Sequence, residues 1–88
     1  MATKTFTIID EAGMHARPTS IVVQEATKFK SEITIEFNGK KANLKSIMSV
    51  MALVIKNNQE VTIDTNGEDA SEALSAIEKV MKEKKLIA

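Results

Sequence analysis

The stretch EITIEFNGKKANL, residues 32–44, decides the fold. Its first half alternates apolar and polar side chains, which is the pattern of a half-buried strand. Asn38-Gly39 follows, and this dipeptide is the strongest short-range signal for a hairpin turn. The lysines of the second half suit an edge strand because they discourage pairing with another sheet. We therefore predict an antiparallel hairpin in the middle of the chain, with these side chains facing inward: Ile33, Ile35 and Phe37.

Apolar periodicity on both sides of the hairpin predicts the remaining elements. The expected order is a strand at 5–9, a helix at 16–28, strands at 32–37 and 40–44, a helix at 47–53, a strand at 60–65, and a final helix that begins at Asp69 with Glu72 as its capping-box partner. Strands with one apolar face and helices with one apolar stripe bury them by packing in two layers. The sequence thus predicts a single α+β domain over residues 1–88, of order β-α-β-β-α-β-α, in which three helices cover one face of a largely antiparallel sheet.

The short helix at 47–53 follows Ser46, which is a good N-cap residue. Met48 falls outside the apolar stripe of this helix and is expected to be exposed. Four apolar residues recur at helical spacing: Ile47, Val50, Met51 and Val54. Of these, Ile47 and Val50 or Met51 can face inward.

Composition and charge exclude several functions. Twelve basic and twelve acidic side chains cancel, which argues against binding to nucleic acid or to a membrane surface. The chain has no cysteine and only one histidine, so we expect no metal site. The longest apolar run, residues 50–55, is too short to cross a bilayer, and the N-terminal residues lack the apolar segment of a signal peptide. We predict a soluble cytoplasmic protein.

The segment AGMHARPTS, residues 12–20, holds the only histidine and the only proline of the chain. Pro18 suits the first turn of a helix, which places His15 just before that helix. The backbone N–H groups of Ala16 and Arg17 then lack intrahelical acceptors, and with the helix dipole they form an anion site. The guanidinium of Arg17 adds a positive charge that suits phosphate oxygens.

These surroundings favour phosphoryl chemistry on His15. The dipole and Arg17 disfavour a second positive charge, so we predict a neutral imidazole that acts as a nucleophile. The same groups would then hold the phosphoryl oxygens of the product. A histidine beside an arginine at a helix start is more often a surface or capping residue, so the residue types alone leave a structural role open.

The motifs GMHARP and LKSIM, some thirty residues apart, together with FNGKKANLKSIM and NGEDASEAL, resemble the HPr family of histidine-containing phosphocarriers of the bacterial phosphoenolpyruvate:sugar phosphotransferase system. The likeness covers the whole chain and is to the low-GC Gram-positive type. It implies an open-faced β-sandwich and a monomeric carrier that is a covalent intermediate, not an enzyme, and that needs no cofactor. Such a carrier accepts a phosphoryl group from enzyme I on Nδ1 of His15, with Arg17 in support, and passes it to the IIA units of sugar permeases.

The resemblance implies a second role at Ser46. In similar proteins an ATP-dependent HPr kinase/phosphorylase modifies the matching serine, and the product acts with a transcriptional regulator in carbon catabolite repression. A phosphate at a helix N-cap would meet the dipole and free N–H groups, so the modification is physically plausible. Ser46 would otherwise serve as an N-cap only.

The family also implies a docking face on the first helix and the short helix. The positions carried over as partner contacts are Arg17, Ser20, Gln24, Ile47, Met48 and Met51. The chain departs from the family pattern at Ala12, where many relatives have a polar residue near the phosphoryl site, and at Ser49, where glycine is common. The first departure leaves the site without one side-chain partner, and the second adds a hydroxyl beside Ser46.

Two other functions remain open from the sequence. The chain could be a purely regulatory binding module that acts through phosphorylated Ser46, in which case His15→Ala would leave its function intact. The element order alone could also indicate a ferredoxin-like domain that binds a ligand or RNA. The neutral charge and the presence of only three aromatic residues weigh against RNA.

Overall fold

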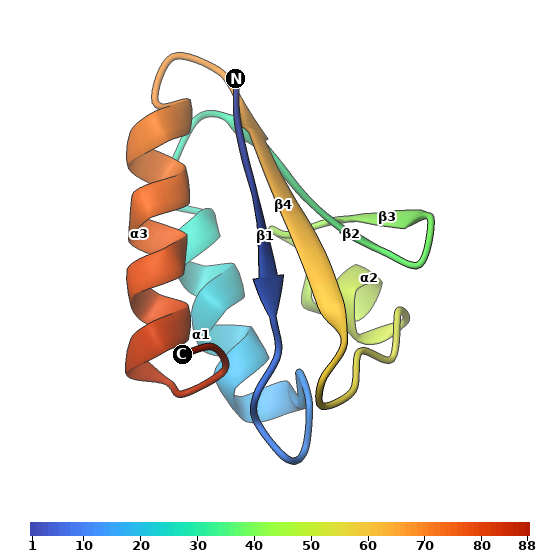
Figure 1. The fold of residues 1–88 in the computed structure, drawn as a ribbon. Coiled ribbons are helices and arrows are strands. Elements are labelled where there is room, and N and C mark those ends of the chain that lie inside the picture. Colours follow the sequence, from blue (N-terminus) through green and yellow to red (C-terminus); the bar gives the residue numbers. More distant parts are fainter.

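The computed structural model describes residues 1–88, and it has helices on one face of an open sheet (Figure 1). The elements are β1 (Ala2–Thr7), α1 (Ala16–Ala26), β2 (Glu32–Phe37), β3 (Lys40–Asn43), α2 (Ile47–Met51), β4 (Glu60–Asn66) and α3 (Ala70–Glu83). The four strands lie in the order β1-β4-β2-β3, and every neighbouring pair is antiparallel. The predicted fold class and element order are confirmed.

The central hairpin forms as predicted. Phe37 of β2 lies opposite Lys40 of β3, with only Asn38 and Gly39 between them. These two residues have φ angles of 57° and 80°. Positive φ at both positions is the requirement of a type I′ turn, whose twist matches that of the flanking strands.

The core lies between the sheet and the helices. Ile35 of β2 faces Ile63 of β4 across the two central strands, and neither side chain is exposed to solvent. From the helical layer Val22 and Ile77 complete this core, again with no exposed surface. Each strand thus contributes alternate residues, and each long helix contributes one stripe, as the sequence pattern indicates.

Several boundaries differ from the predicted ones. The first strand spans Ala2–Thr7 and not residues 5–9, because its polar N-terminal residues pair with β4 as far as Ala2 opposite Thr65. The first helix ends at Ala26, and β3 and α2 are also shorter than predicted. Val54, which continues the apolar repeat of this helix in the sequence, lies beyond the end of α2 and is 63% exposed.

The predicted capping box at the start of α3 is also wrong. Asp69 is the N-cap residue, but its side chain makes no capping hydrogen bond. Its carboxylate instead accepts hydrogen bonds from the backbone N–H of Lys30 at 2.9 Å and of Ser31 at 3.0 Å, and from the Ser31 hydroxyl. Asp69 therefore joins the start of α3 to the segment that leads into β2.

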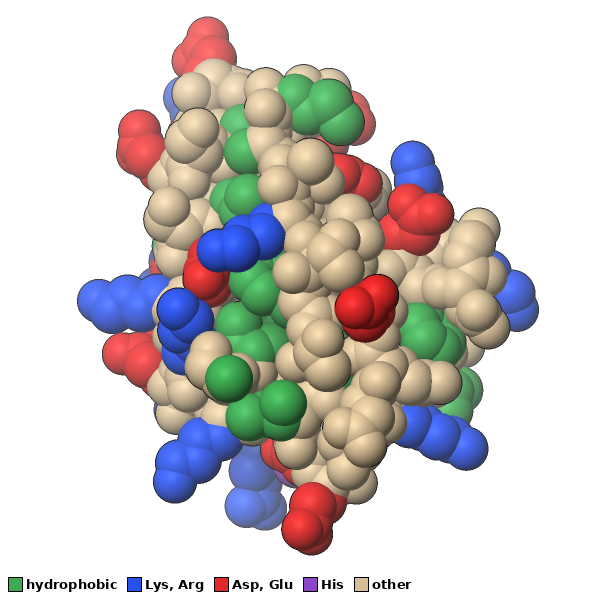
Figure 2. Space-filling model, in the orientation of Figure 1, with side chains coloured by type: hydrophobic (Ala, Val, Ile, Leu, Met, Phe, Trp, Pro, Cys, Tyr) green, Lys and Arg blue, Asp and Glu red, His purple; other side chains and the backbone are tan.

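The surface carries charges of both signs. On the face seen in Figure 2, acidic and basic side chains are interspersed, and hydrophobic side chains show between α3 and β1. No helix has the length and the apolar run that a membrane span requires.

Candidate functional site

His15 occupies the N-cap position of α1. Its backbone is extended, with φ −78° and ψ 168°, and its side chain makes no capping hydrogen bond. The carbonyl of His15 accepts a hydrogen bond from the backbone N–H of Thr19 at 3.2 Å, which closes the first helical turn. The imidazole is 42% exposed. The ring therefore projects from the start of the helix and is accessible to another molecule.

The loop before His15 is held by backbone hydrogen bonds. Gly13 N–H donates to the carbonyl of Asp10 at 2.8 Å, and Met14 N–H donates to the carbonyl of Ile55 at 3.0 Å. Gly13 has a φ of +68°, and a Cβ built at this position would lie 2.3 Å from the Ile55 oxygen. Only glycine allows this close approach of the two backbones.

Asp10 bridges this loop and the imidazole. Its Oδ1 accepts a hydrogen bond from the backbone N–H of Ala12 at 2.9 Å, and its Oδ2 lies 3.2 Å from Nε2 of His15. The hydrogen bond from Ala12, followed by the one with His15, lowers the pKa of Asp10 below its usual value. A carboxylate is thus present beside the ring at neutral pH.

A hollow of about 270 Å³ opens beside the ring. Its lining residues are Asp10, His15, Arg17, Pro18, Ile21 and Lys84. Lys84 reaches the hollow from the end of α3, because Ile9 N–H donates to the carbonyl of Leu86 at 2.8 Å and holds this end of the chain near the loop. Figure 1 shows the C-terminus close to the start of α1. The hollow therefore presents two cationic side chains beside an imidazole, an arrangement that can bind an anion.

The residues predicted for anion binding lie together at this helix start. Ala16 and Arg17 are the first two residues of α1. Backbone N–H groups at such positions have no intrahelical acceptor, and the positive end of the helix dipole lies there. The Arg17 side chain is exposed and forms no salt bridge.

Ser46 lies outside this hollow, at the N-cap of α2. Its hydroxyl oxygen accepts a hydrogen bond from the backbone N–H of Ser49 at 3.3 Å, as predicted for an N-cap. The Ser49 side chain is exposed and makes no hydrogen bond of its own. Of the two hydroxyl groups, only that of Ser46 therefore caps the helix.

The predicted contact residues lie on two helices that pack against each other, α1 and α2. On α1, Arg17 and Gln24 are exposed, and the Ser20 hydroxyl donates to the carbonyl of Arg17 at 2.8 Å. On α2, Met48 is 82% exposed, while its neighbours Ile47 and Met51 are only partly so. The six residues thus come from two helices in contact.

Sequence reasoning missed Asp10 and Lys84. A signal for Asp10 was present, because Asp followed three residues later by Gly is typical of a type I turn. A turn closed by the hydrogen bond from Gly13 N–H to the Asp10 carbonyl forms here. For Lys84 there was no such signal, since its place beside His15 depends on the packing of α3. Asp10 does not replace the polar partner that the sequence lacks at Ala12, because it lies on the Nε2 side of the ring.

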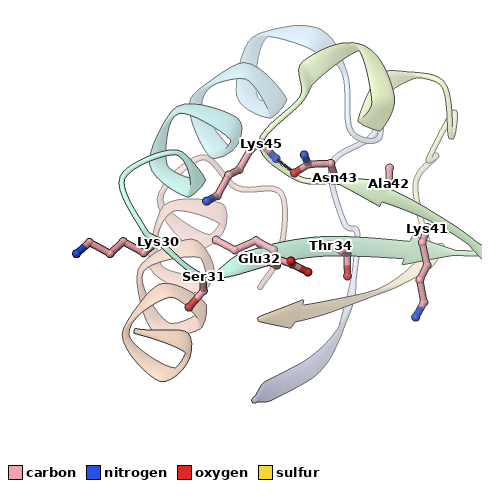
Figure 3. A pocket seen from close by; sticks show the side chains of 9 residues that line it. Lys30, Ser31, Glu32, Thr34, Lys41, Ala42, Asn43 and Lys45 are labelled. Atoms are coloured by element: carbon pink, nitrogen blue, oxygen red, sulfur yellow. Dashed lines mark hydrogen bonds between the residues drawn. The ribbon is translucent and has the colours of Figure 1, made fainter. Parts of the chain in front are cut away.

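A larger hollow of about 450 Å³ lies at the ends of β2 and β3 (Figure 3). Lys30 and Lys41 at its rim point away from each other, and Lys45 Nζ is already bonded to the carbonyl of Phe29 at 2.7 Å. These lysines do not converge on one point. We therefore regard the hollow at His15 as the candidate site.

Comparisons with known proteins identify relatives of this chain. The family model described as "PTS HPr component phosphorylation site" matches residues 2–83. The chain is similar to a histidine-containing phosphocarrier protein of Mycoplasma, with 49% identity, a TM-score of 0.96 and 98% of each chain covered. It is similar to the phosphocarrier protein HPr of Bacillus anthracis, with 42% identity, a TM-score of 0.83 and coverage of 90% of this chain and 94% of that chain.

A further relative is the catabolite repression protein Crh of Bacillus subtilis, whose structure is a swapped, intertwined dimer. The identity is 38% and the TM-score is 0.74, with coverage of 98% of this chain and 99% of that chain. The fold described above is thus shared by phosphocarrier proteins and by a catabolite repression protein.

Proposed function

Because the chain belongs to the HPr family of the phosphotransferase system, we propose that it accepts a phosphoryl group from enzyme I on His15 and passes it to the IIA units of sugar permeases. A protein of this family is a phosphocarrier and not a classical enzyme. The observation that carries the proposal is the exposed imidazole of His15 beside a hollow lined by Arg17 and Lys84.

The chemistry of the transfer follows from these groups. The lone pair of Nδ1 attacks phosphorus, and the bond between phosphorus and the donor breaks. The guanidinium of Arg17 and the free N–H groups of Ala16 and Arg17 face the phosphoryl oxygens, so the positive end of the helix stabilises the added charge. A nitrogen–phosphorus bond is labile, which allows the group to move on to an acceptor.

Mass spectrometry after incubation with enzyme I and phosphoenolpyruvate tests this role. We expect one acid-labile phosphate on the wild-type chain and none on His15→Ala. Arg17→Ala should keep the fold but accept the group more slowly, because an exposed cation without a salt bridge contributes little to stability. Phosphate on the His15→Ala chain would show that the acceptor is another residue.

We propose that the same partners dock on α1 and α2. The exposed thioether of Met48 supports this assignment, because methionine is flexible and suits a surface that meets several partners. The contact residues proposed are those predicted from the sequence: Arg17, Ser20, Gln24, Ile47, Met48 and Met51. We expect Met48→Glu to weaken binding to enzyme I and to a IIA unit while leaving the unfolding midpoint unchanged, since the side chain is almost fully exposed.

A second, compatible function is regulatory phosphorylation at Ser46 by an HPr kinase/phosphorylase, followed by binding of a catabolite control regulator. The likeness to Crh, a protein named for catabolite repression, favours it. Incubation with ATP and an HPr kinase should add phosphate to the wild type and to Ser49→Ala, but not to Ser46→Ala. A purely regulatory protein would retain its function after His15→Ala and lose it after Ser46→Ala.

We propose that both activities belong to a cytoplasmic monomer. Light scattering tests the oligomeric state directly.

A further inference from the structure

The contact between Asp10 and His15 has a direct consequence for the imidazole. Asp10 Oδ2 lies 3.2 Å from Nε2, and the carboxylate is held in place because its Oδ1 accepts the backbone N–H of Ala12. An ionised carboxylate can only accept hydrogen bonds. A hydrogen bond between these atoms therefore requires a proton on Nε2.

We propose that Asp10 holds the neutral ring of His15 in the tautomer that carries its proton on Nε2, so that Nδ1 presents its lone pair to the incoming phosphoryl group. The proposal deepens the phosphocarrier function and rests on it. Asp10 is a positioning residue in this scheme, because it acts on the ring and does not touch the phosphoryl group.

The surroundings of the ring support this assignment. The other charged groups that line the hollow, Arg17 and Lys84, are cations and offer no competing acceptor. The carboxylate is only 23% exposed, which limits its exchange with water. The turn that carries it is closed by the bond from Gly13 N–H to the Asp10 carbonyl at 2.8 Å, so the carboxylate stays on the Nε2 side.

The transfer then needs no proton movement. The Nδ1 lone pair forms the new bond to phosphorus, and the electron pair of the broken bond returns to the donor atom. Nε2 keeps its proton throughout. The positive charge that the ring acquires lies next to the Asp10 carboxylate, so one side chain both selects the nucleophilic nitrogen and offsets the charge of the product.

Asp10→Asn gives the sharpest test. The amide oxygen can still accept from Ala12, but the NH₂ group then faces Nε2 and donates to it, which favours the opposite tautomer. We expect the ¹⁵N chemical shifts of the His15 ring, measured at about pH 9 where an ordinary histidine is neutral, to move toward the Nδ1–H form. The rate of phosphoryl transfer from enzyme I to the chain should fall by about tenfold. This loss is smaller than the one expected when a fully buried catalytic histidine loses its carboxylate partner.

The matched control is Glu11→Gln, which removes the same charge from the neighbouring exposed residue. This variant should keep the wild-type ¹⁵N shifts and rate. Unfolding midpoints of both variants show whether the loop is intact. Unchanged ring shifts and an unchanged rate in Asp10→Asn would overturn the proposal for Asp10, even if His15 proves to be the acceptor. The ring shifts are measured without enzyme I, so they test Asp10 even if the wild-type chain accepts no phosphate, a result that would instead refute the proposed function.

Discussion

The backbone N–H of Met14 donates to the carbonyl of Ile55 at 3.0 Å, and this bond ties the loop that carries His15 to the segment after α2. The two backbones meet at Gly13, whose missing side chain leaves room for the Ile55 oxygen. The position of the imidazole therefore depends on a contact between segments some forty residues apart in the sequence.

Gly13→Ala should break this contact. The added Cβ would lie 2.3 Å from Ile55 O and 2.7 Å from Lys56 Cα, on a residue with φ of +68°. We expect a loss of about 3 kcal/mol of unfolding free energy, from overpacking and from the left-handed backbone together. Urea denaturation measures this loss, and phosphoryl acceptance should fall as well.

Gly39→Ala is the control for this prediction. Gly39 also has a positive φ, of +80°, but no atom lies within 4 Å of a Cβ built there. Only the backbone cost remains, so we expect a loss of about 1 kcal/mol and normal phosphoryl acceptance. Equal losses of unfolding free energy in the two variants would show that the close contact of Gly13 with Ile55 does not contribute to stability.

Val54→Gly should stabilise the protein. Val54 has a φ of 53°, in the left-handed region that β-branched residues avoid, and its side chain is 63% exposed. Glycine removes this strain and loses little packing, so we expect a gain of about 1 kcal/mol in urea denaturation. Ala52→Gly, at an exposed residue with φ −65°, should instead be destabilising. A loss of stability in both variants would contradict the assignment of strain to Val54.

Asp69→Asn should reduce stability in a pH-dependent way. Hydrogen bonds from the Ser31 hydroxyl, and next from the backbone N–H of Lys30, lower the pKa of Asp69 to about 2. A carboxyl group whose pKa is lower in the folded than in the unfolded chain stabilises the fold at any pH above its unfolded-chain pKa of about 3.9. This stabilisation is lost as the pH falls through the pKa of the folded chain. The variant should therefore unfold at a lower temperature than the wild type at neutral pH.

The difference between the two melting temperatures should narrow as the pH falls from about 4 toward 2. Asp64→Asn is the control, because the Asp64 carboxylate in the same part of the chain makes no hydrogen bond or salt bridge. A difference that stays constant across this range would contradict the role given to the Asp69 charge.

Ser46→Ala should cost about 0.5–1 kcal/mol of unfolding free energy, at the lower end for the loss of an N-cap, because α2 is short and the capping bond is long. The bond joins Ser46 Oγ to Ser49 N–H at 3.3 Å. Ser49→Ala removes a hydroxyl of the same size that caps nothing, so it should leave the urea midpoint unchanged.

Local patterns in the sequence were sufficient to predict the sheet and the helical layer of the fold. Alternation in residues 32–37 predicts β2, and Asn38-Gly39 predicts the turn, because both depend on neighbouring residues only. The motif around His15 likewise predicts an imidazole at the start of a helix. These features depend on backbone preferences and on periodic burial, which a short stretch of sequence already specifies.

Other features were decided by the tertiary structure. Asp69 was predicted to cap α3, but it bonds to Ser31 because the pairing of Glu32 with Asn66 brings the residues before β2 next to the start of α3. Lys84 reaches the hollow at His15 through the bond between Ile9 and Leu86, and Asp10 meets Nε2 because long-range bonds shape its loop. A side-chain hydrogen bond requires its two atoms to be placed within a fraction of an ångström. Only the folded chain does this, so the sequence determined where the imidazole lies, and the tertiary structure decided which groups surround it.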